Sequence, residues 1–187
     1  MKILCIVTDG TASQDREAWI DRVVAGLNAG ANMVQIREKN LDARELLELT
    51  RLTVAFAGEA PVVVNSRVDV AIAAGAAGAH LPAHSIAASR WRSIAPGFLM
   101  GVSCHTLTEL RQAELDGADY AIFGPVFAPL SKTSDLTPLG LDGLRAAARS
   151  VNIPVFAIGG ITTANASACF EAGARGVAAI SLFRETR

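Results

Sequence analysis

Short apolar runs recur along the chain, each too short for a typical helix and bounded by Gly, Pro or Asp. Eight of these runs are candidate buried strands: Ile3 to Val7, Met33 to Ile36, Pro61 to Val64, Gly78 to Leu81, Phe98 to Val102, Tyr120 to Phe123, Pro154 to Ile158 and Gly176 to Ile180. Between them lie segments with helical spacing and good helix formers, such as Glu17 to Leu27, Ala43 to Phe56, Leu107 to Leu115 and Leu141 to Ser150. The pattern predicts alternation of strand and helix throughout.

A glycine-alanine pair precedes four of these strands, where it can end a helix and let the next strand pack closely. The four pairs are Gly30-Ala31, Gly75-Ala76, Gly117-Ala118 and Gly173-Ala174. Repetition of like units favours an α/β fold of the closed (β/α)8 TIM-barrel type over an open sheet. A doubly wound, flavodoxin-like sheet is the structural alternative. Because few residues follow the eighth strand, we expect the eighth helix to be absent or truncated, which leaves an apolar flank for a homo-oligomer partner.

The size and charge of the chain exclude several classes of protein. With 187 residues, 51% of them hydrophobic, we expect a single domain over residues 1–187. The 17 basic residues are balanced by 18 acidic ones, so no overall positive field draws the chain to nucleic acid or an anionic membrane. No apolar run approaches the roughly 20 residues that span a bilayer.

The cysteines and the N-terminus indicate a cytoplasmic protein. Cys5, Cys104 and Cys169 are far apart and lack the paired spacing of a zinc site or a disulfide framework. We therefore expect them to be buried thiols in a reducing compartment. The apolar run at the N-terminus is short and enters a polar turn, which is typical of a buried strand rather than a signal peptide.

Polar side chains at the predicted strand ends are the candidate ligand-binding groups, because barrels bind ligands where their strands end. In the second strand, alternation places Gln35 and Arg37 opposite Val34 and Ile36, toward the barrel axis. An inward arginine requires an anion, and Lys39 adds a second cation beside it. The alternative is an internal ion pair between Arg37 and a neighbouring acid.

Two turns late in the chain are candidate phosphate sites. Gly159-Gly160 follows the seventh strand and Ile180-Ser181 the eighth, where such barrels commonly present backbone N–H groups to a phosphate. Glycine also serves in any tight turn, which is the alternative. The long polar loop over residues 124–135 carries Lys132, interpreted either as a cation that closes over the bound anion or as a solvated surface lysine.

Neutral polar groups end two more strands. Asn65 follows the third strand and Ser103 the fifth, and both suit hydrogen bonding to a heterocycle. His105 is a candidate for proton transfer, with a helix-capping or surface role as the alternative. His80 points inward from the fourth strand, where a core histidine with satisfied hydrogen bonds is an equally simple interpretation. No cluster of acids suggests a metal site.

Five ordered stretches carry a family resemblance: Val34 to Asn40, Asn65 to Ala71, Gly101 to Thr106, Gly117 to Tyr120 with Phe123 to Phe127, and Ala157 to Ile161. On these stretches the chain resembles the thiamine phosphate synthase and TenI family over nearly its whole length. The synthase joins a pyrimidine methyl pyrophosphate to a thiazole phosphate and releases pyrophosphate with the help of Mg²⁺. The resemblance therefore implies an enzyme of thiamine biosynthesis with a small phosphorylated heterocycle as its ligand.

The resemblance also assigns roles to residues at matching positions. The pyrimidine and its pyrophosphate would be held by Gln35, Arg37, Lys39, Asn65, Ser103 and Lys132. The thiazole phosphate would be held by Gly159, Gly160, Ile180 and Ser181, and the thiazole would contact the loop from Pro129 to Ser131. The candidate catalytic residues are Ser103, Lys132 and His105.

The chain departs from the synthase pattern at two positions. Ser66 stands where synthases have an aspartate after the asparagine of the third strand, and Ser85 stands where they have another after the fourth strand. Neutral serines bind Mg²⁺ poorly, so no metal or other cofactor is expected. The fourth-strand loop reads Leu81-Pro82, as in tautomerases of the TenI type, but the catalytic histidine of those enzymes falls at Pro125.

Three functions follow from this mixture of matches and departures. The retained cations favour a divergent, synthase-like transferase, which we rank first for ligand recognition. The lost acids favour a TenI-like thiazole tautomerase, with His105 or His84 in place of the usual histidine. The third hypothesis is a non-catalytic protein that binds thiazole phosphate or thiamine phosphate.

Overall fold

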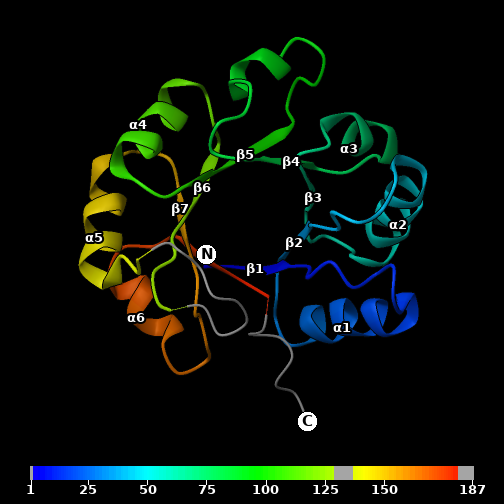
Figure 1. Ribbon diagram of the computed structural model, residues 1–187, viewed down its shortest axis with the longest axis horizontal. Coiled ribbons are helices and arrows are strands. Elements are labelled where there is room, and N and C mark those ends of the chain that lie inside the picture. The colour runs from blue at the N-terminus through cyan, green and yellow to red at the C-terminus, as the bar shows by residue number, and fades with distance from the viewer. Residues whose placement is uncertain (1, 129–136, 181–187) are drawn as a thin grey trace.

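The structure, a computed structural model, describes residues 2–128 and 137–180 and contains a closed barrel of parallel strands (Figure 1). Each strand pairs in parallel with the next, and the eighth pairs with the first. The strands are β1 (Ile3–Val7), β2 (Met33–Ile36), β3 (Val62–Asn65), β4 (Gly78–Leu81), β5 (Leu99–Cys104), β6 (Tyr120–Phe123), β7 (Val155–Ile158) and β8 (Gly176–Ala179). The predicted (β/α)8 barrel is confirmed, and the open flavodoxin-like sheet is excluded.

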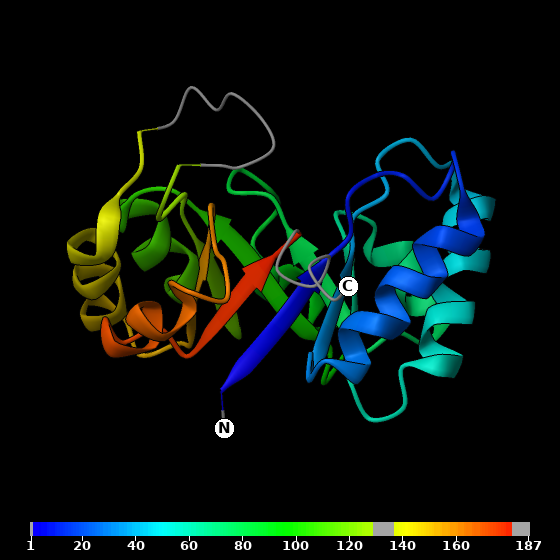
Figure 2. The same ribbon diagram turned by 90° about the horizontal axis from the view of Figure 1, so that it is seen from below.

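Helices surround the ring of strands (Figure 1). The strands tilt across the barrel, and β1 and β8 end on the same side of it (Figure 2). The helices are α1 (Arg16–Asn28), α2 (Ala43–Phe56), α3 (Val68–Ala74), α4 (Leu107–Leu115), α5 (Gly140–Ser150) and α6 (Ala166–Glu171). The helix α2 begins with a capping box, in which the Asp42 carboxylate accepts from the Glu45 N–H and Glu45 reciprocates. A local signal thus marks the start of this helix.

The connection between β4 and β5 corrects the prediction of a helix between every pair of strands. Within the described chain it holds only a short 3₁₀ helix, η1 (Ala88–Trp91). Pro82 and Pro96 flank the segment, and its other residues form turns. The Arg92 guanidinium anchors the segment by donating to the carbonyls of Phe98 and Gly117 and to the Asp119 carboxylate. These bonds add to the packing of Ala88 and Trp91 against the core.

Alternation along the strands divides the buried side chains into two clusters. The larger cluster lies between the strands and the helices and includes Val34 and Ile36. The smaller one fills the barrel interior and includes Cys5, Val7, Met33, Val63, Tyr120, Ile122, Phe156 and Ala178. All three cysteines are free and buried, and burial raises the pKa of the Cys5 thiol to about 12, so this thiol stays protonated.

Two further expectations from the sequence concern the eighth helix and membrane-spanning helices. The expected loss or truncation of the eighth helix concerns residues 181–187, which lie outside the described residues. Over residues 2–128 and 137–180, we find no helix with the length and apolar character required to cross a membrane.

Candidate active site

The end of β2 places an unsatisfied amide inside the barrel. Gln35 is only 3% exposed, and it lies on the same side of β2 as the interior residue Met33. Its Nε2 atom has no hydrogen-bond partner among the described residues. Since buried amides are nearly always hydrogen-bonded, this donor is suited to a ligand that enters from the barrel mouth.

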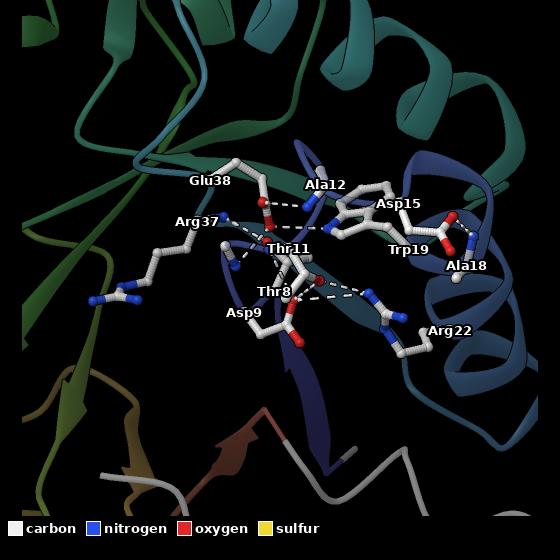
Figure 3. A network of polar contacts seen from close by, with 11 residues as sticks. Thr8, Asp9, Thr11, Ala12, Asp15, Ala18, Trp19, Arg22, Arg37 and Glu38 are labelled. Carbon is white, nitrogen blue, oxygen red and sulfur yellow. Dashed lines mark hydrogen bonds and ion pairs between the residues drawn. The ribbon is translucent and has the colours of Figure 1, made fainter. Parts of the chain in front are cut away.

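Arg37 follows two residues later and leaves the strand end without a counterion. Its backbone N–H donates to Thr8 Oγ1 at 2.8 Å, which fixes the main chain against β1. Figure 3 shows its side chain pointing away from the polar network around Asp9 and Glu38. No acid in the described part of the chain forms an ion pair with it, so the alternative interpretation, an internal ion pair, has no support there. Lys39 is exposed beside it.

Glu38 points the other way and organises the loop after β1 (Figure 3). Its carboxylate is 5% exposed and accepts from the backbone N–H groups of Gly10 and Ala12 and from the Trp19 indole. Sequence reasoning missed this residue as a structural anchor. The available signal was the period of two, which turns Glu38 outward between the inward Arg37 and the exposed Lys39.

The β1 end carries a second polar cluster beside this anchor. The Asp9 carboxylate accepts from the backbone N–H and the hydroxyl of Thr11, and Arg22 donates to that hydroxyl at 2.6 Å (Figure 3). Ile180, a candidate phosphate-site residue, lines a small cleft with Ile6, Asp9 and Arg22. The end of β8 and the start of the β1 loop therefore face the same space.

Three neutral side chains form a chain of hydrogen bonds inside the barrel. His80 Nε2 lies 2.9 Å from Ser103 Oγ, and His80 Nδ1 lies 3.3 Å from the Tyr120 hydroxyl. Burial lowers the pKa of His80 to about 3 and raises that of Tyr120 well above its usual value, so both are neutral at physiological pH. His80 is thus a core histidine with both ring nitrogens partnered, and Ser103 is its link to the barrel mouth.

His105 lies where α4 begins. Its backbone N–H donates to Glu109 Oε2, while the Thr106 hydroxyl accepts from the Glu109 N–H as the N-cap. The imidazole Nδ1 lies 2.6 Å from the Gly124 carbonyl oxygen, which can only accept, so Nδ1 carries the hydrogen. His84 Nε2 lies 4.0 Å from Glu109 Oε1. The His105 backbone serves the helix start, while its Nε2 remains available.

The glycines after β7 lie directly beneath the loop after β6. A Cβ on Gly159 would lie 2.6 Å from Pro125 Cβ, and one on Gly160 would lie 2.4 Å from the Ala128 carbonyl oxygen. Both glycines also have positive φ, at 98° and 59°. The two loops are tied by the Val126 N–H, which donates to Ile158, and the Phe127 N–H, which donates to Gly159. Packing and backbone conformation therefore both require these glycines.

The same turn leaves backbone donors available. Within the described residues, the N–H groups of Gly159 and Gly160 donate to no backbone or side-chain acceptor. Asn165 clamps the turn, because its Nδ2 donates to the Gly160 carbonyl and its Oδ1 accepts from the Thr162 N–H. The turn is therefore clamped by Asn165, and its two glycine N–H groups have no acceptor among residues 2–128 and 137–180.

Comparison with known proteins agrees with this architecture. The family model described as thiamine monophosphate synthase matches residues 4–183. The chain belongs to the thiamine monophosphate synthase family. It is similar to a thiamine-phosphate synthase of Chloroflexus aurantiacus, with 44% identity over 184 residues, covering 95% of this chain and 83% of that protein. A thiamine-phosphate synthase of Chlorobium luteolum is 38% identical and covers 96% of this chain and 84% of its own.

A solved structure of the same family has the same fold. The thiamine phosphate pyrophosphorylase of Pyrococcus furiosus superposes with a TM-score of 0.81 and 37% identity, covering 96% of this chain and 85% of that one. Membership of the thiamine monophosphate synthase family is thus supported by sequence and by structure, and the predicted family is confirmed.

The metal positions implied by the thiamine monophosphate synthase resemblance do not fit a divalent cation here. Ser66, with φ of 64°, accepts from the Asn65 amide at 2.9 Å, and its N–H donates to the His80 carbonyl. Ser85 is exposed. Neither supplies a carboxylate, and no group of three His, Cys, Asp or Glu side chains in the described part of the chain is arranged for a metal.

Four predicted site residues lie outside the described residues: Pro129, Ser131, Lys132 and Ser181. Their roles stay predictions from the sequence. The other candidates, Gln35, Arg37, Asn65, Ser103, Gly159, Gly160 and Ile180, lie on strand ends or directly after them, on the carboxyl side of the barrel. Lys39 and His105 follow β2 and β5 on that same side.

Proposed function

We propose that this protein is a divergent thiamine phosphate synthase that binds a pyrimidine methyl pyrophosphate and a thiazole phosphate at the carboxyl ends of its strands. The observation that carries the proposal is the pair formed by Gln35, on the interior side of β2, and Arg37, directly after β2. The first is a buried amide with a free donor, and the second is a guanidinium without an ion-pair partner among the described residues. An aromatic heterocycle with an anionic substituent supplies what both groups lack.

The proposed reaction needs charge stabilisation at the departing pyrophosphate. The bond between the pyrimidine methylene carbon and the pyrophosphate oxygen breaks, and the thiazole nitrogen forms a bond to that carbon. The pyrophosphate takes the electron pair, so negative charge grows on its bridging oxygen. Arg37 and Lys39, with Lys132 as predicted from the sequence, are the cations that stabilise this charge. Gln35, Asn65 and Ser103 orient the pyrimidine.

The turn after β7 is the proposed site for the phosphate of the thiazole. Its support is the rigid pair of glycines whose N–H groups are free within the described residues. Ile180 and Ser181 extend this site from β8, and Pro129 and Ser131 are proposed to contact the thiazole. Because neutral serines stand at positions 66 and 85, the proposal routes no step through Mg²⁺ and assigns stabilisation of the leaving group to the protein cations.

The test is a coupling assay with purified protein, pyrimidine methyl pyrophosphate and thiazole phosphate, with and without Mg²⁺. We expect thiamine phosphate and pyrophosphate to form in equal amounts. The variant Arg37→Ala should lower kcat/KM by about 10- to 100-fold, since a charge-assisted hydrogen bond contributes roughly 1.5–3 kcal/mol. The control is Arg44→Ala, which removes an exposed arginine of α2 that pairs with Glu48 on the same helix. Binding without turnover would overturn the synthase and leave the non-catalytic hypothesis.

One observation favours a tautomerase as the second candidate. The His105 imidazole bonds to the carbonyl of Gly124, the residue directly before Pro125, where the TenI resemblance places a catalytic histidine. With Nδ1 protonated, Nε2 is available to accept a proton from a thiazole carboxylate phosphate. Isomerisation of that substrate, lost in His105→Ala and unchanged in Arg37→Ala, would establish the tautomerase in place of the synthase.

A further inference from the structure

The direction of the hydrogen bonds from Tyr120 through His80 to Ser103 follows from the number of donors. Burial keeps His80 neutral, with a pKa of about 3, so the imidazole carries one N–H. The Tyr120 hydroxyl keeps its hydrogen because burial raises its pKa. Two arrangements are then possible, one with the imidazole hydrogen on Nδ1 and one with it on Nε2.

Tyr120 decides between these arrangements. With the hydrogen on Nδ1, the imidazole would donate to the phenol oxygen, and the phenol hydrogen would have no acceptor, since His80 is the only partner of the hydroxyl within the described residues. A buried donor without a partner is destabilising, because it has lost its hydrogen bond to water. The favoured arrangement therefore has the Tyr120 hydroxyl donating to Nδ1 and Nε2–H donating to Ser103 Oγ.

The consequence lies at Ser103, the end of the chain nearest the barrel mouth. Its oxygen already accepts from His80, and its own hydrogen has no acceptor among the described residues. Ser103 is half-buried on β5. A hydroxyl fixed in this way acts as a donor toward whatever binds in the mouth.

We propose that Tyr120 and His80 are positioning residues that fix Ser103 as a hydrogen-bond donor, so that the ligand must present an acceptor to it. The proposal rests on the proposed function for the identity of the ligand. A Ser103 hydroxyl that donates selects for an unprotonated ring nitrogen or a phosphate oxygen at this position and against an amino group.

The surrounding packing is built to keep these groups in contact. The Tyr120 ring stacks on Phe156 with 4.8 Å between centroids. Gly101 lies beside the contact, and a Cβ there would come within 2.4 Å of the Tyr120 hydroxyl and 2.6 Å of His80 Nδ1. Any side chain at this position would push the two groups apart.

The direction of the hydrogen bonds can be tested without a ligand, by ¹⁵N NMR of the imidazole nitrogens in the full chain. We expect His80 to stay neutral from pH 5 to pH 9, because burial lowers its pKa to about 3, and to hold its hydrogen on Nε2. The variant Tyr120→Phe keeps the ring stack but removes the hydroxyl that donates to Nδ1, so the Nδ1 resonance should shift toward that of a ring nitrogen that accepts no hydrogen bond. A wild-type His80 protonated on Nδ1, or an unchanged Nδ1 resonance in Tyr120→Phe, would overturn the proposal.

Binding of pyrimidine methyl pyrophosphate, measured by calorimetry, tests the effect on the ligand. Ser103→Ala and Tyr120→Phe should each raise Kd by roughly tenfold, the cost of about one hydrogen bond. His80→Gln keeps an N–H toward Ser103 and should bind more tightly than His80→Leu. The matched control is Ser150→Ala, because the Ser150 hydroxyl donates to the Ala147 carbonyl at the end of α5. Equal losses in His80→Gln and His80→Leu would overturn the positioning role.

Two further ligands show whether the acceptor is a ring nitrogen or a phosphate oxygen. They also distinguish failure of this proposal from failure of the proposed function. If Ser103→Ala weakens binding of the pyrimidine alcohol, which lacks phosphate, the acceptor is a ring nitrogen. If Ser103→Ala weakens only the binding of inorganic pyrophosphate, the acceptor is a phosphate oxygen. Either result supports a donor at Ser103, and no effect on either ligand overturns it. Should the wild type bind none of these ligands, the proposed function fails, while the NMR result still decides the hydrogen-bond direction.

Discussion

The Trp19 indole N–H of α1 donates to the Glu38 carboxylate at 2.9 Å, which joins the first helix to the end of the second strand. Because Glu38 also holds Gly10 and Ala12, one acidic side chain fixes the loop after β1 to the residue that follows Arg37. The position of a candidate anion-binding residue thus depends on a carboxylate that faces away from the site.

Replacing this carboxylate should destabilise the protein. Glu38→Ala leaves three N–H groups without this acceptor, two of them buried and that of Gly10 partly buried, so we expect the free energy of unfolding to fall by about 3 kcal/mol. Urea denaturation followed by tryptophan fluorescence measures this change. Glu48→Ala is the matched control, because Glu48 is exposed and pairs with the exposed Arg44, and it should change stability by less than about 0.5 kcal/mol. Similar values for both variants would contradict the anchoring role.

The glycines after β7 should tolerate alanine less well than a glycine of similar conformation elsewhere. Gly58 has φ of 61°, and a Cβ added there would meet nothing within 4 Å, so Gly58→Ala costs only backbone strain of roughly 1 kcal/mol. Gly160→Ala adds contact with the Ala128 carbonyl and should cost at least about 1 kcal/mol more. Thermal unfolding of both variants measures the difference. An equal loss would mean that close packing of the two loops contributes nothing.

Stability should depend on pH through His80. Its pKa is lowered from 6.5 to about 3 in the folded protein, so the unfolded chain binds more protons between these values. The free energy of unfolding therefore falls as pH decreases below 6.5, by up to roughly 1.4 kcal/mol per pH unit. The variant His80→Gln lacks this contribution. The difference in free energy of unfolding between the wild type and this variant should therefore shrink from pH 7 to pH 4. A constant difference would argue that His80 titrates normally.

Restoring the two carboxylates should change the response to Mg²⁺. Ser66 already has a positive φ, a conformation that aspartate adopts more readily than most residues, and Ser85 is exposed, so neither change should disturb the fold. We expect the Ser66→Asp and Ser85→Asp double variant to couple the two substrates faster with Mg²⁺ than without it. The coupling assay with both substrates measures this effect. No gain with Mg²⁺ would count against a synthase site that has lost its metal ligands.

Much of the fold was predictable because its strands are marked locally. The bounds of β1, β2, β4 and β6 and of α2 and α4 agree with the apolar runs and helical segments in the sequence. The short η1 connection was not predictable from periodicity, because its anchor is the Arg92 side chain, which bonds to residues 25 and 27 positions later.

The site could be predicted where the alternation of side chains along a strand determines the face to which each one points. That alternation placed Gln35 inside the barrel and turned Arg37 away from Ile36. It could not identify the partners of a residue, so the contact between His80 and Tyr120, 40 residues apart, and the burial of the Glu38 charge emerged only from the three-dimensional arrangement. Strand register, which no local pattern reveals, brings these groups together.

The pairing of β1 with both β2 and β8 has a consequence for biosynthesis. During translation, β1 leaves the ribosome before the other strands of the barrel, yet one of its edges stays unpaired until residues 176–179 have been made. The nascent chain must therefore carry an open row of backbone donors and acceptors from the synthesis of β1 to that of β8. This interval is the period in which the polypeptide is most prone to aggregate, unless transient local structure or a chaperone covers the open edge.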